Sequence, residues 1–312
     1  MGHEHNHSHG ANKKALMISF IIITTFMIVE AIGGFLTNSL ALLSDAGHML
    51  SDAVSLGVGF LAFTLGERVA NHNKTYGYKR FEILAAVFNG VTLILISIYI
   101  FYEAYKRFAA PPEIASMGML IIASLGLLVN VIVAWILMRG DTEENLNLRA
   151  AFLHVIGDLL GSVGAVTAAL LIMFFGWSWA DPVASIVVAI LVLVSGWRVS
   201  KDAVHVLMEG TPKNVDLQDI IKTIEDVKGV ISIHDLHVWS ITSGQNALSC
   251  HAVVNGDLSI IETQKILRAI EHELEYKGIG HVTIQLENKD HPHEDSFMCQ
   301  NEFDISAHSH EH

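Results

Sequence analysis

The chain has 312 residues, of which 51% are hydrophobic and only 16% are charged, and its mean hydropathy is +0.43. Because soluble domains contain about 25% charged residues, this composition excludes an ordinary soluble enzyme and a disordered protein. The net charge of −13 argues against a nucleic-acid partner, since binding to phosphates requires a basic face. Two cysteines cannot form a disulfide framework.

Long apolar segments fill the first two thirds of the chain. A helix that crosses a bilayer needs about 20 mostly apolar residues. The first segment is too long for the apolar region of a signal peptide, and no cleavage site of small residues follows it. We therefore predict six membrane spans, at residues 15–36, 40–65, 81–108, 114–138, 147–175 and 179–206.

The distribution of Lys and Arg between the predicted loops indicates the orientation of these spans. If both termini are cytoplasmic, ten of the basic residues before position 209 lie on the inside, and only Lys106 and Arg107 lie outside. Short cytoplasmic loops carry an excess of Lys and Arg. The pattern thus predicts a multi-pass protein of the cell membrane with both termini in the cytoplasm.

A change of composition at Gly210-Thr211-Pro212 marks the start of a second, acidic region, since Gly followed by Pro ends a helix. Its apolar patterns predict helices at 215–227 and 259–274 and strands at 230–240, 247–255 and 281–286. This α-β-β-α-β order favours an α+β fold with an antiparallel sheet and both helices on one face. We expect four regions: a His-rich tail (1–14), a six-helix transmembrane domain (15–208), a cytoplasmic domain (209–290) and a second His-rich tail (291–312).

Two predicted spans carry the same pair of polar residues, a His followed four positions later by an Asp. The second span contains His48 and Asp52, and the fifth contains His154 and Asp158. Residues four apart lie on one helix face, and ionisable groups within a membrane normally face a cavity or each other. Two His and two Asp suit a tetrahedral divalent transition metal, with zinc first and cobalt or cadmium also compatible. Asp45 lies one turn before His48 and is either an auxiliary ligand, a proton carrier or a structural residue.

The alternative for these spans is that the polar residues hydrogen-bond helices together, which two matched pairs and a third carboxylate make hard to sustain. Gly157, Gly161 and Gly164 would allow the second and fifth spans to approach closely. Three further intramembrane groups either line the transport path or pack helices: Glu30, Asn89 and Asn130.

Several motifs resemble the cation diffusion facilitator family, in its bacterial zinc/cadmium/cobalt proton-antiporter branch. They are the segment from Glu30 to Asp52, Tyr76-Gly-Tyr-Lys-Arg-Phe-Glu82, the His154/Asp158 pair, Leu207-Met-Glu-Gly-Thr-Pro212 and His234-Asp-Leu-His-Val-Trp239. The resemblance implies a homodimer with six spans, a metallochaperone-like cytoplasmic domain, and metal export coupled to entry of protons or potassium. It also implies that His48, Asp52, His154 and Asp158 form the transport site.

The chemistry of the ligands agrees with coupling to protons. Metal ligands must be deprotonated to bind, and His is the side chain that changes charge near neutral pH. We expect one site, exposed to each side in turn, at which protons compete with zinc, cadmium or cobalt. No prosthetic group is expected, and the metal is the transported substrate and also a regulatory ligand.

The same resemblance places metal ligands in the cytoplasmic domain at His234, His251, His281 and Glu287. His234 and His237 stand three apart in a predicted strand and should face opposite sides, so only His234 is assigned to the site. His281 and Glu287 share a face but lie about 20 Å apart along the strand, so they should serve different ions or subunits. Surface histidines in an acidic domain are the alternative.

The sequence offers little support for further metal sites or for other functions. The loop after the second span lacks the carboxylate of some relatives and has Tyr78 in place of their His, so no site is assigned there and His72 is taken as a solvated residue. The His-rich tails should be disordered and either collect metal weakly or be dispensable. An intramembrane metalloenzyme is disfavoured, because four protein ligands leave no position for a catalytic water. A channel would need weaker, multi-site binding, whereas sensing by the cytoplasmic domain is compatible with export.

Overall fold

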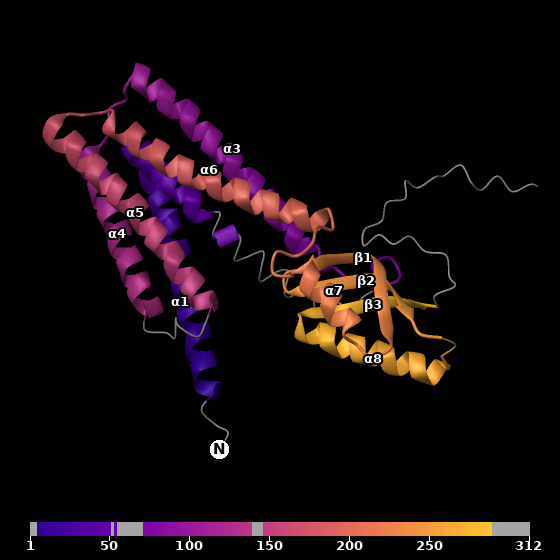
Figure 1. Ribbon diagram of the computed structural model, residues 1–312. Coiled ribbons are helices and arrows are strands. Elements are labelled where there is room, and N and C mark those ends of the chain that lie inside the picture. Colours follow the sequence, from indigo (N-terminus) through magenta and orange to yellow (C-terminus); the bar gives the residue numbers. More distant parts are fainter. Residues whose placement is uncertain (1–4, 51–52, 55–70, 139–145, 257, 289–312) are drawn as a thin grey trace, which may run out of the picture. The chain divides into compact units, whose positions relative to one another are not determined.

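The computed structural model describes residues 5–50, 53–54, 71–138, 146–256 and 258–288. The chain divides into two compact units (Figure 1). One comprises the described residues within Met1–Thr64 and Leu84–Lys201, and the other those within Leu65–Ile83 and Asp202–His312. The first is helical and the second contains a sheet, and each is described by itself.

Five long apolar helices make up the helical unit and match five of the six predicted spans. They are α1 (His5–Thr37), α3 (Phe81–Ala109), α4 (Ser116–Met138), α5 (Leu146–Phe175) and α6 (Ala180–Leu207). Each is long and apolar enough to cross a membrane. Of the second predicted span, the structure describes a helix over residues 40–50 and positions 53–54, and the rest lies outside the described residues.

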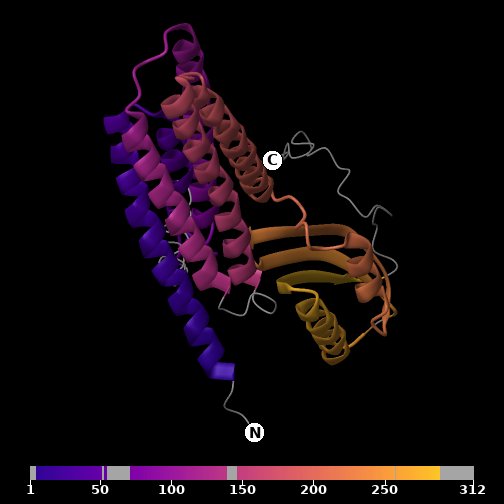
Figure 2. The same ribbon diagram turned by 90° about the vertical axis from the view of Figure 1, so that its left-hand side faces the viewer.

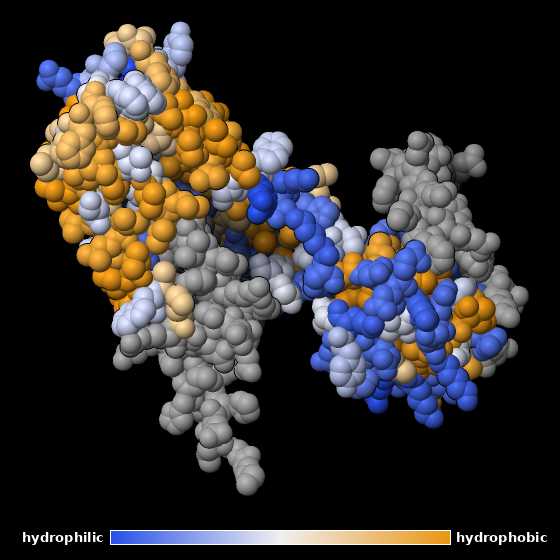
Figure 3. Space-filling model, turned by 60° about the vertical axis from the view of Figure 1, so that its left-hand side comes forward, coloured by the Kyte–Doolittle hydropathy of each residue, from blue (hydrophilic) through white to orange (hydrophobic). Residues whose placement is uncertain are grey.

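The surface of these helices is apolar where a soluble protein would be polar. Phe35 is 76% exposed, Phe88 71% and Trp197 66%. Figure 3 shows hydrophobic side chains over most of the visible face of this unit, whereas the sheet-containing unit is covered largely by hydrophilic ones. Exposed side chains of this size and number match a lipid solvent rather than water.

The helices pack through small residues at their closest approaches. Helix α1 packs along α4, and α4 along α5 (Figure 2). A side chain at Gly90 of α3 would come within 2.9 Å of the Gly196 carbonyl oxygen of α6, and one at Gly196 would meet the Gly90 carbonyl oxygen at 2.9 Å. Glycine at both positions therefore lets the two backbones touch.

A buried ion pair fixes the start of the helix that carries His48. Asp181, the second residue of α6, is fully buried and accepts hydrogen bonds from the Ser39 hydroxyl (2.7 Å) and from the backbone N–H groups of Leu40 (2.9 Å) and Ala41 (3.1 Å). Arg107 Nη1 of α3 lies 3.4 Å from the same carboxylate and donates to the Asn38 carbonyl oxygen at 2.6 Å. The carboxylate thus satisfies N–H groups that a helix start leaves unpaired.

The second unit has the predicted α-β-β-α-β order. Its elements are α7 (Leu217–Glu225), β1 (Val230–Thr242), β2 (Gln245–Val254), α8 (Ile260–Tyr276) and β3 (Ile279–Glu287). β1 and β2 form an antiparallel hairpin whose turn contains Gly244 at a φ of 72°. β3 pairs with β2 in parallel, so the predicted fully antiparallel sheet is wrong. The reason is the connection: a helix joins β2 to β3, and such a crossover returns the chain in the same direction.

Both helices of this unit cover the same face of the sheet, as predicted (Figure 1). Ile220 and Ile224 of α7 and Ile270 and Leu274 of α8 join Leu248 and other strand residues in one buried core. Helix α8 begins with a capping box in which Ser259 and Glu262 each bond the other's backbone N–H. The opposite face of the sheet is left for polar side chains.

The predicted disorder of the N-terminal tail is wrong for residues 5–14, because α1 already begins at His5. No proline stands in this part of the chain, so the hydrogen-bond ladder of the apolar helix continues toward the N-terminus without a break. The predicted tail at 291–312 lies outside the described residues.

Candidate metal sites

The helical unit brings His48 and Asp158 together from positions far apart in the sequence. His48 stands on the helix described over residues 40–50 and Asp158 on α5, and His48 Nε2 lies 3.3 Å from Asp158 Oδ1. The side chains are 18% and 2% exposed. An imidazole nitrogen and a carboxylate oxygen at this separation can bind one divalent ion between them.

Further carboxylates surround this pair. Asp45 is 2% exposed and lies close enough to Asp158, His48 and Glu30 to interact with each. A side chain at Gly161 of α5 would come within 2.8 Å of Asp45 Oδ1, so glycine there makes room for the carboxylate. The helical unit thus gathers carboxylate groups beside His48, and carboxylate oxygens are ligands that suit a cation.

The other two predicted transport-site residues are placed less completely. Asp52 lies outside the described residues. His154 belongs to α5 one turn before Asp158, but only its backbone is described. Their membership in the site therefore stays a prediction.

The additional intramembrane groups are all buried. Glu30 is 1% exposed, and neither of its carboxylate oxygens has a hydrogen-bond partner among the described residues. Asn130 of α4 donates from Nδ2 to the Ser162 hydroxyl of α5 at 3.1 Å, and Ser162 in turn interacts with Asp45. Asn130 therefore links α4 to α5 close to Asp45. Asn89 of α3 is also buried, at 4% exposure.

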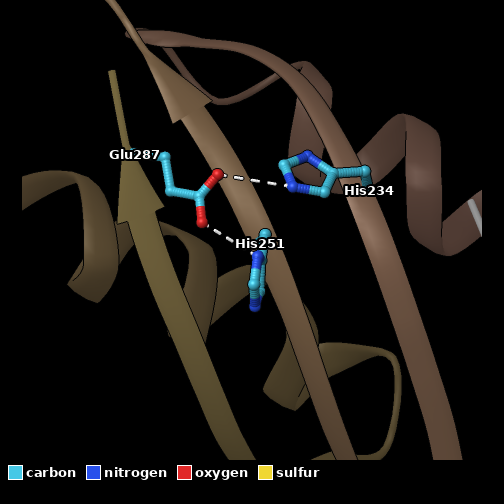
Figure 4. Close-up of side chains that lie close together, drawn as sticks. All are labelled: His234, His251 and Glu287. Carbon is cyan, nitrogen blue, oxygen red and sulfur yellow. Dashed lines mark ion pairs between the residues drawn. The ribbon is translucent and has the colours of Figure 1, made fainter. Parts of the chain in front are cut away.

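In the sheet-containing unit, three of the four predicted ligands come together on the face of the sheet away from the helices. His234 of β1, His251 of β2 and Glu287 of β3 point toward one another (Figure 4). Glu287 Oε2 lies 3.3 Å from His234 Nε2, and Glu287 Oε1 lies 2.9 Å from His251 Nδ1. His234 and Glu287 are buried, and His251 is half-buried.

The strand register explains this convergence. His234 is the direct partner of His251 across the antiparallel hairpin, and Glu287 pairs with Val253, two residues from His251. Side chains two apart in a strand share a face. One ligand from each of three adjacent strands therefore meets at a single point.

The three side chains fit a metal ion. Their ligand atoms, two imidazole nitrogens and one carboxylate oxygen, all lie within 4.8 Å of one another. In a tetrahedral zinc site with bonds of about 2.1 Å, ligand atoms are about 3.4 Å apart, so a small closure would complete the geometry. The donor set is the kind that zinc, cobalt and cadmium accept.

His281 does not join this group. Its backbone pairs with Ala247, whereas His251 pairs with Gln285, four residues further along β3. Its ring instead meets Tyr76 edge-on, with centroids 5.5 Å apart. His281 and Glu287 do share a face of β3, as expected, because Val282, Ile284 and Leu286 pack against the core.

The prediction that His234 and His237 face opposite sides of the strand is wrong. His234 pairs with His251 and His237 pairs with Ser249, two residues apart on β2, so both face the same side. The cause is a β-bulge between them, which places two residues of β1 opposite one of β2. Asp235 in this bulge has a φ of 49°, a left-handed conformation that is uncommon outside glycine.

Two neighbours of the trio have supporting or neutral roles. Gln285 Nε2 donates to Glu287 Oε1 at 2.7 Å and so orients the carboxylate. Cys250 precedes His251 but points into the core. Burial, and secondarily the charge of Asp235, raises the pKa of the Cys250 thiol to about 12, so it stays protonated and is a poor metal ligand.

Among the described residues, no cluster of three possible metal ligands includes a residue of the loop after the second predicted span. His72 is exposed, and the Lys74 ammonium lies 4.2 Å from the centre of the Tyr78 ring.

Sequence reasoning missed Asp235 and the Arg107–Asp181 pair. Asp235 directly follows His234 in the sequence, but no sequence pattern indicates the β-bulge that turns its side chain toward His251. An Arg near the end of the third predicted span and an Asp near the start of the sixth could have signalled the Arg107–Asp181 pair.

Two family models match the chain, one on each side of position 210. Residues 16–208 match the model described as cation efflux transmembrane domain, and residues 212–289 match that of cation efflux protein, cytoplasmic domain. The chain belongs to the cation efflux family. It is therefore a multi-pass membrane transporter with a cytoplasmic C-terminal domain, and not an enzyme.

Relatives of this cation efflux protein match it along most of its length. The "Cadmium, cobalt and zinc/H(+)-K(+) antiporter" of Bacillus subtilis is 66% identical over 309 residues, which cover 99% of each chain. The "Metal cation efflux system protein CzcD" of Cupriavidus metallidurans is 43% identical over 289 residues, covering 92% of this chain and 90% of that one. A solved metal-bound C-terminal domain of the latter transporter is 40% identical and covers 23% of this chain and 99% of that one, with a TM-score of 0.21.

Proposed function

We propose that this cation efflux protein exports zinc, and also cadmium and cobalt, from the cytoplasm in exchange for protons or potassium. The observation that carries the proposal is the 3.3 Å approach of His48 to Asp158 between two apolar helices. The name of the Bacillus subtilis relative, which is 66% identical over 309 residues, supports the choice of these three metals and of protons and potassium as the exchanged ions. Export, rather than uptake, follows from the family.

The proposed transport site consists of His48, Asp52, His154 and Asp158. The His and Asp of each pair are four apart, one helical turn, so each helix can present two ligands to one ion. Alternating access would expose this single site first to the cytoplasm and then to the outside. The metal leaves when protons compete for the two imidazoles.

Asp45 and Glu30 extend the site in this proposal. Both are buried beside Asp158. When the metal ion leaves, a carboxylate within the membrane must bind another cation, a proton or potassium, because an uncompensated charge there is costly. Asp45 is thus assigned as an auxiliary ligand or proton carrier. Six spans, cytoplasmic termini in the cell membrane and a homodimer complete the proposal.

In the cytoplasmic domain, the proposed site is regulatory and consists of His234, His251 and Glu287. The cluster lies on a sheet face and not between membrane helices, so it can bind an ion but offers no path across the bilayer. His281 would bind elsewhere or not at all, given its contact with Tyr76.

Transport into liposomes tests the function. Purified protein is reconstituted, a pH gradient is imposed, and uptake of zinc, cadmium and cobalt is followed in parallel. Wild-type protein should accumulate metal against its gradient, and Asp158→Ala should not. Glu271→Gln, which removes one charge from the exposed surface of α8, should behave as wild type. Unchanged uptake by Asp158→Ala would contradict the proposed site.

A further inference from the structure

The bulge in β1 places an additional carboxylate against the cytoplasmic trio. His234 and His237 face the same side of the sheet as His251 and Ser249, their partners on β2, while Ile233, Leu236 and Val238 face the core. Asp235 is the extra residue that makes this change of parity. Bulges commonly redirect a side chain in this way.

The Asp235 carboxylate lies between two imidazoles. Asp235 Oδ1 lies 3.1 Å from His237 Nε2, a hydrogen bond, and Asp235 Oδ2 lies 3.9 Å from His251 Nε2. His251 therefore meets Glu287 at its Nδ1 edge and Asp235 at its Nε2 edge. These edges are on opposite sides of the ring, so Asp235 cannot bind the same ion as His251 Nδ1.

The chemistry of a metal-bound histidine gives this second carboxylate a role. A neutral imidazole that binds metal through Nδ1 must carry its proton on Nε2. Metal-bound histidines almost always donate this remaining N–H to a carboxylate, carbonyl or water, which fixes the tautomer and the ring orientation. The Asp235 carboxylate is about 1 Å beyond hydrogen-bond distance from Nε2, and a small turn of the ring would close it.

We propose that Asp235 is a positioning residue for the cytoplasmic metal site, accepting the Nε2–H of His251 while His237 holds the carboxylate in place. The inference rests on the proposed metal site of His234, His251 and Glu287. It adds a residue that touches no metal but decides how one ligand is presented. It also gives the unusual backbone a role: the left-handed bulge turns Asp235, the residue next to His234, toward the Nε2 edge of His251.

The same backbone supplies clean test variants. Glycine and asparagine both tolerate a positive φ, so Asp235→Gly and Asp235→Asn keep the bulge, whereas alanine would strain it. Glycine removes the acceptor altogether. Asparagine keeps an acceptor oxygen but removes its charge. A purely long-range effect of charge would weaken binding equally in both variants.

The measurement is zinc affinity of the full-length protein in detergent, by competition with a chelating dye. All variants carry Asp158→Ala so that the proposed transport site does not contribute. Loss of such an outer partner typically weakens metal binding about 10–100-fold. We expect Asp235→Gly to fall in this range, Asp235→Asn to lie between Asp235→Gly and the parent, and Glu271→Gln to match the parent. The d–d absorption of bound cobalt should change in Asp235→Gly, while the unfolding temperature without metal should not.

Two outcomes would overturn the inference, and they differ. If His251→Ala abolishes binding while Asp235→Gly stays within about twofold of the parent, Asp235 has no positioning role, although the metal site stands. If His251→Ala leaves the affinity unchanged, the proposed cytoplasmic site itself fails, and this inference fails with it.

Discussion

The two proposed metal sites of this protein are built in different ways. In the helical unit, His48 and Asp158 come from apolar helices, and a His/Asp pair on each helix is set by a spacing of four residues. In the cytoplasmic domain, His234, His251 and Glu287 come from three strands, one from each, and meet through strand register. The ligands of a site on helices can therefore be predicted from their spacing in the sequence. The ligands of a site on a sheet depend on how distant strands pair.

The surroundings differ as well. His48 and Asp158 lie within a group of helices whose outer surface is apolar. An unpaired charge in such an environment is costly. The cytoplasmic trio occupies one face of a sheet whose other face packs on helices. The first arrangement favours a site that must always hold a cation, and the second a site that can be filled or empty. Four experiments compare the two regions.

Removing both imidazoles from the proposed transport site should have the largest effect. We expect His48→Ala with His154→Ala to abolish metal-driven proton movement, because neither a strong nitrogen ligand nor the proposed principal proton carriers would remain. The check is a pH-sensitive dye inside liposomes during a zinc pulse. His272→Ala, an exposed histidine of α8, serves as the control. Metal export with unchanged proton coupling would contradict the proposed exchange.

Breaking the buried ion pair of the helical unit should cost less, but should still be severe. Asp181→Ala removes the carboxylate that faces Arg107 and that accepts from the N–H groups of Leu40 and Ala41. Removing one partner of a buried pair costs about 3–5 kcal/mol. We expect a lower unfolding temperature in detergent, partly recovered when Arg107→Met is added. An equal unfolding temperature in wild type and Asp181→Ala would show that the pair does not stabilise the start of the helix that carries His48.

Disabling the cytoplasmic site should leave transport in place. Glu287→Gln replaces a carboxylate that both His234 and His251 approach, so we expect fewer zinc ions bound per chain at equilibrium while metal uptake into liposomes continues. Elemental analysis after gel filtration gives the bound metal. Complete loss of metal uptake would show that transport requires the cytoplasmic site.

The smallest effect is expected at the capping box of α8, remote from both sites. Ser259→Ala removes a cap worth about 1 kcal/mol, so hydrogen exchange should quicken in the first turn of α8 and not in α7. In the folded protein, hydrogen bonds from Ser259 lower the pKa of Glu262 below its ordinary value. A lowered pKa stabilises the fold above the unfolded-state pKa, and this contribution disappears as the pH falls through the folded-state pKa. The difference between Ser259→Ala and wild type should therefore shrink in acid; a constant difference would contradict the role of Glu262.

Much of the architecture was available from hydropathy and period alone. The five helices with apolar windows and the α-β-β-α-β order of the cytoplasmic domain match the predicted segments. The parallel pairing of β3 was not predicted, because alternation of side chains is the same in parallel and antiparallel strands. The start of α1 at His5 differs from the predicted disorder, because a His-rich composition without proline does not stop a helix from continuing toward its N-terminus.

The sequence by itself placed His48 and Asp158 in apolar segments and predicted that they bind a divalent metal, since ionisable groups within a membrane are costly and are usually functional. It also predicted that His281 and Glu287 lie too far apart along one strand to share an ion. Only the tertiary structure decided that His234, His251 and Glu287 meet, and that a bulge turns His237 and Asp235 to their side. The physical reason is that a helix fixes its own side-chain directions, whereas a strand's faces are set by its partners and change wherever a bulge adds one residue.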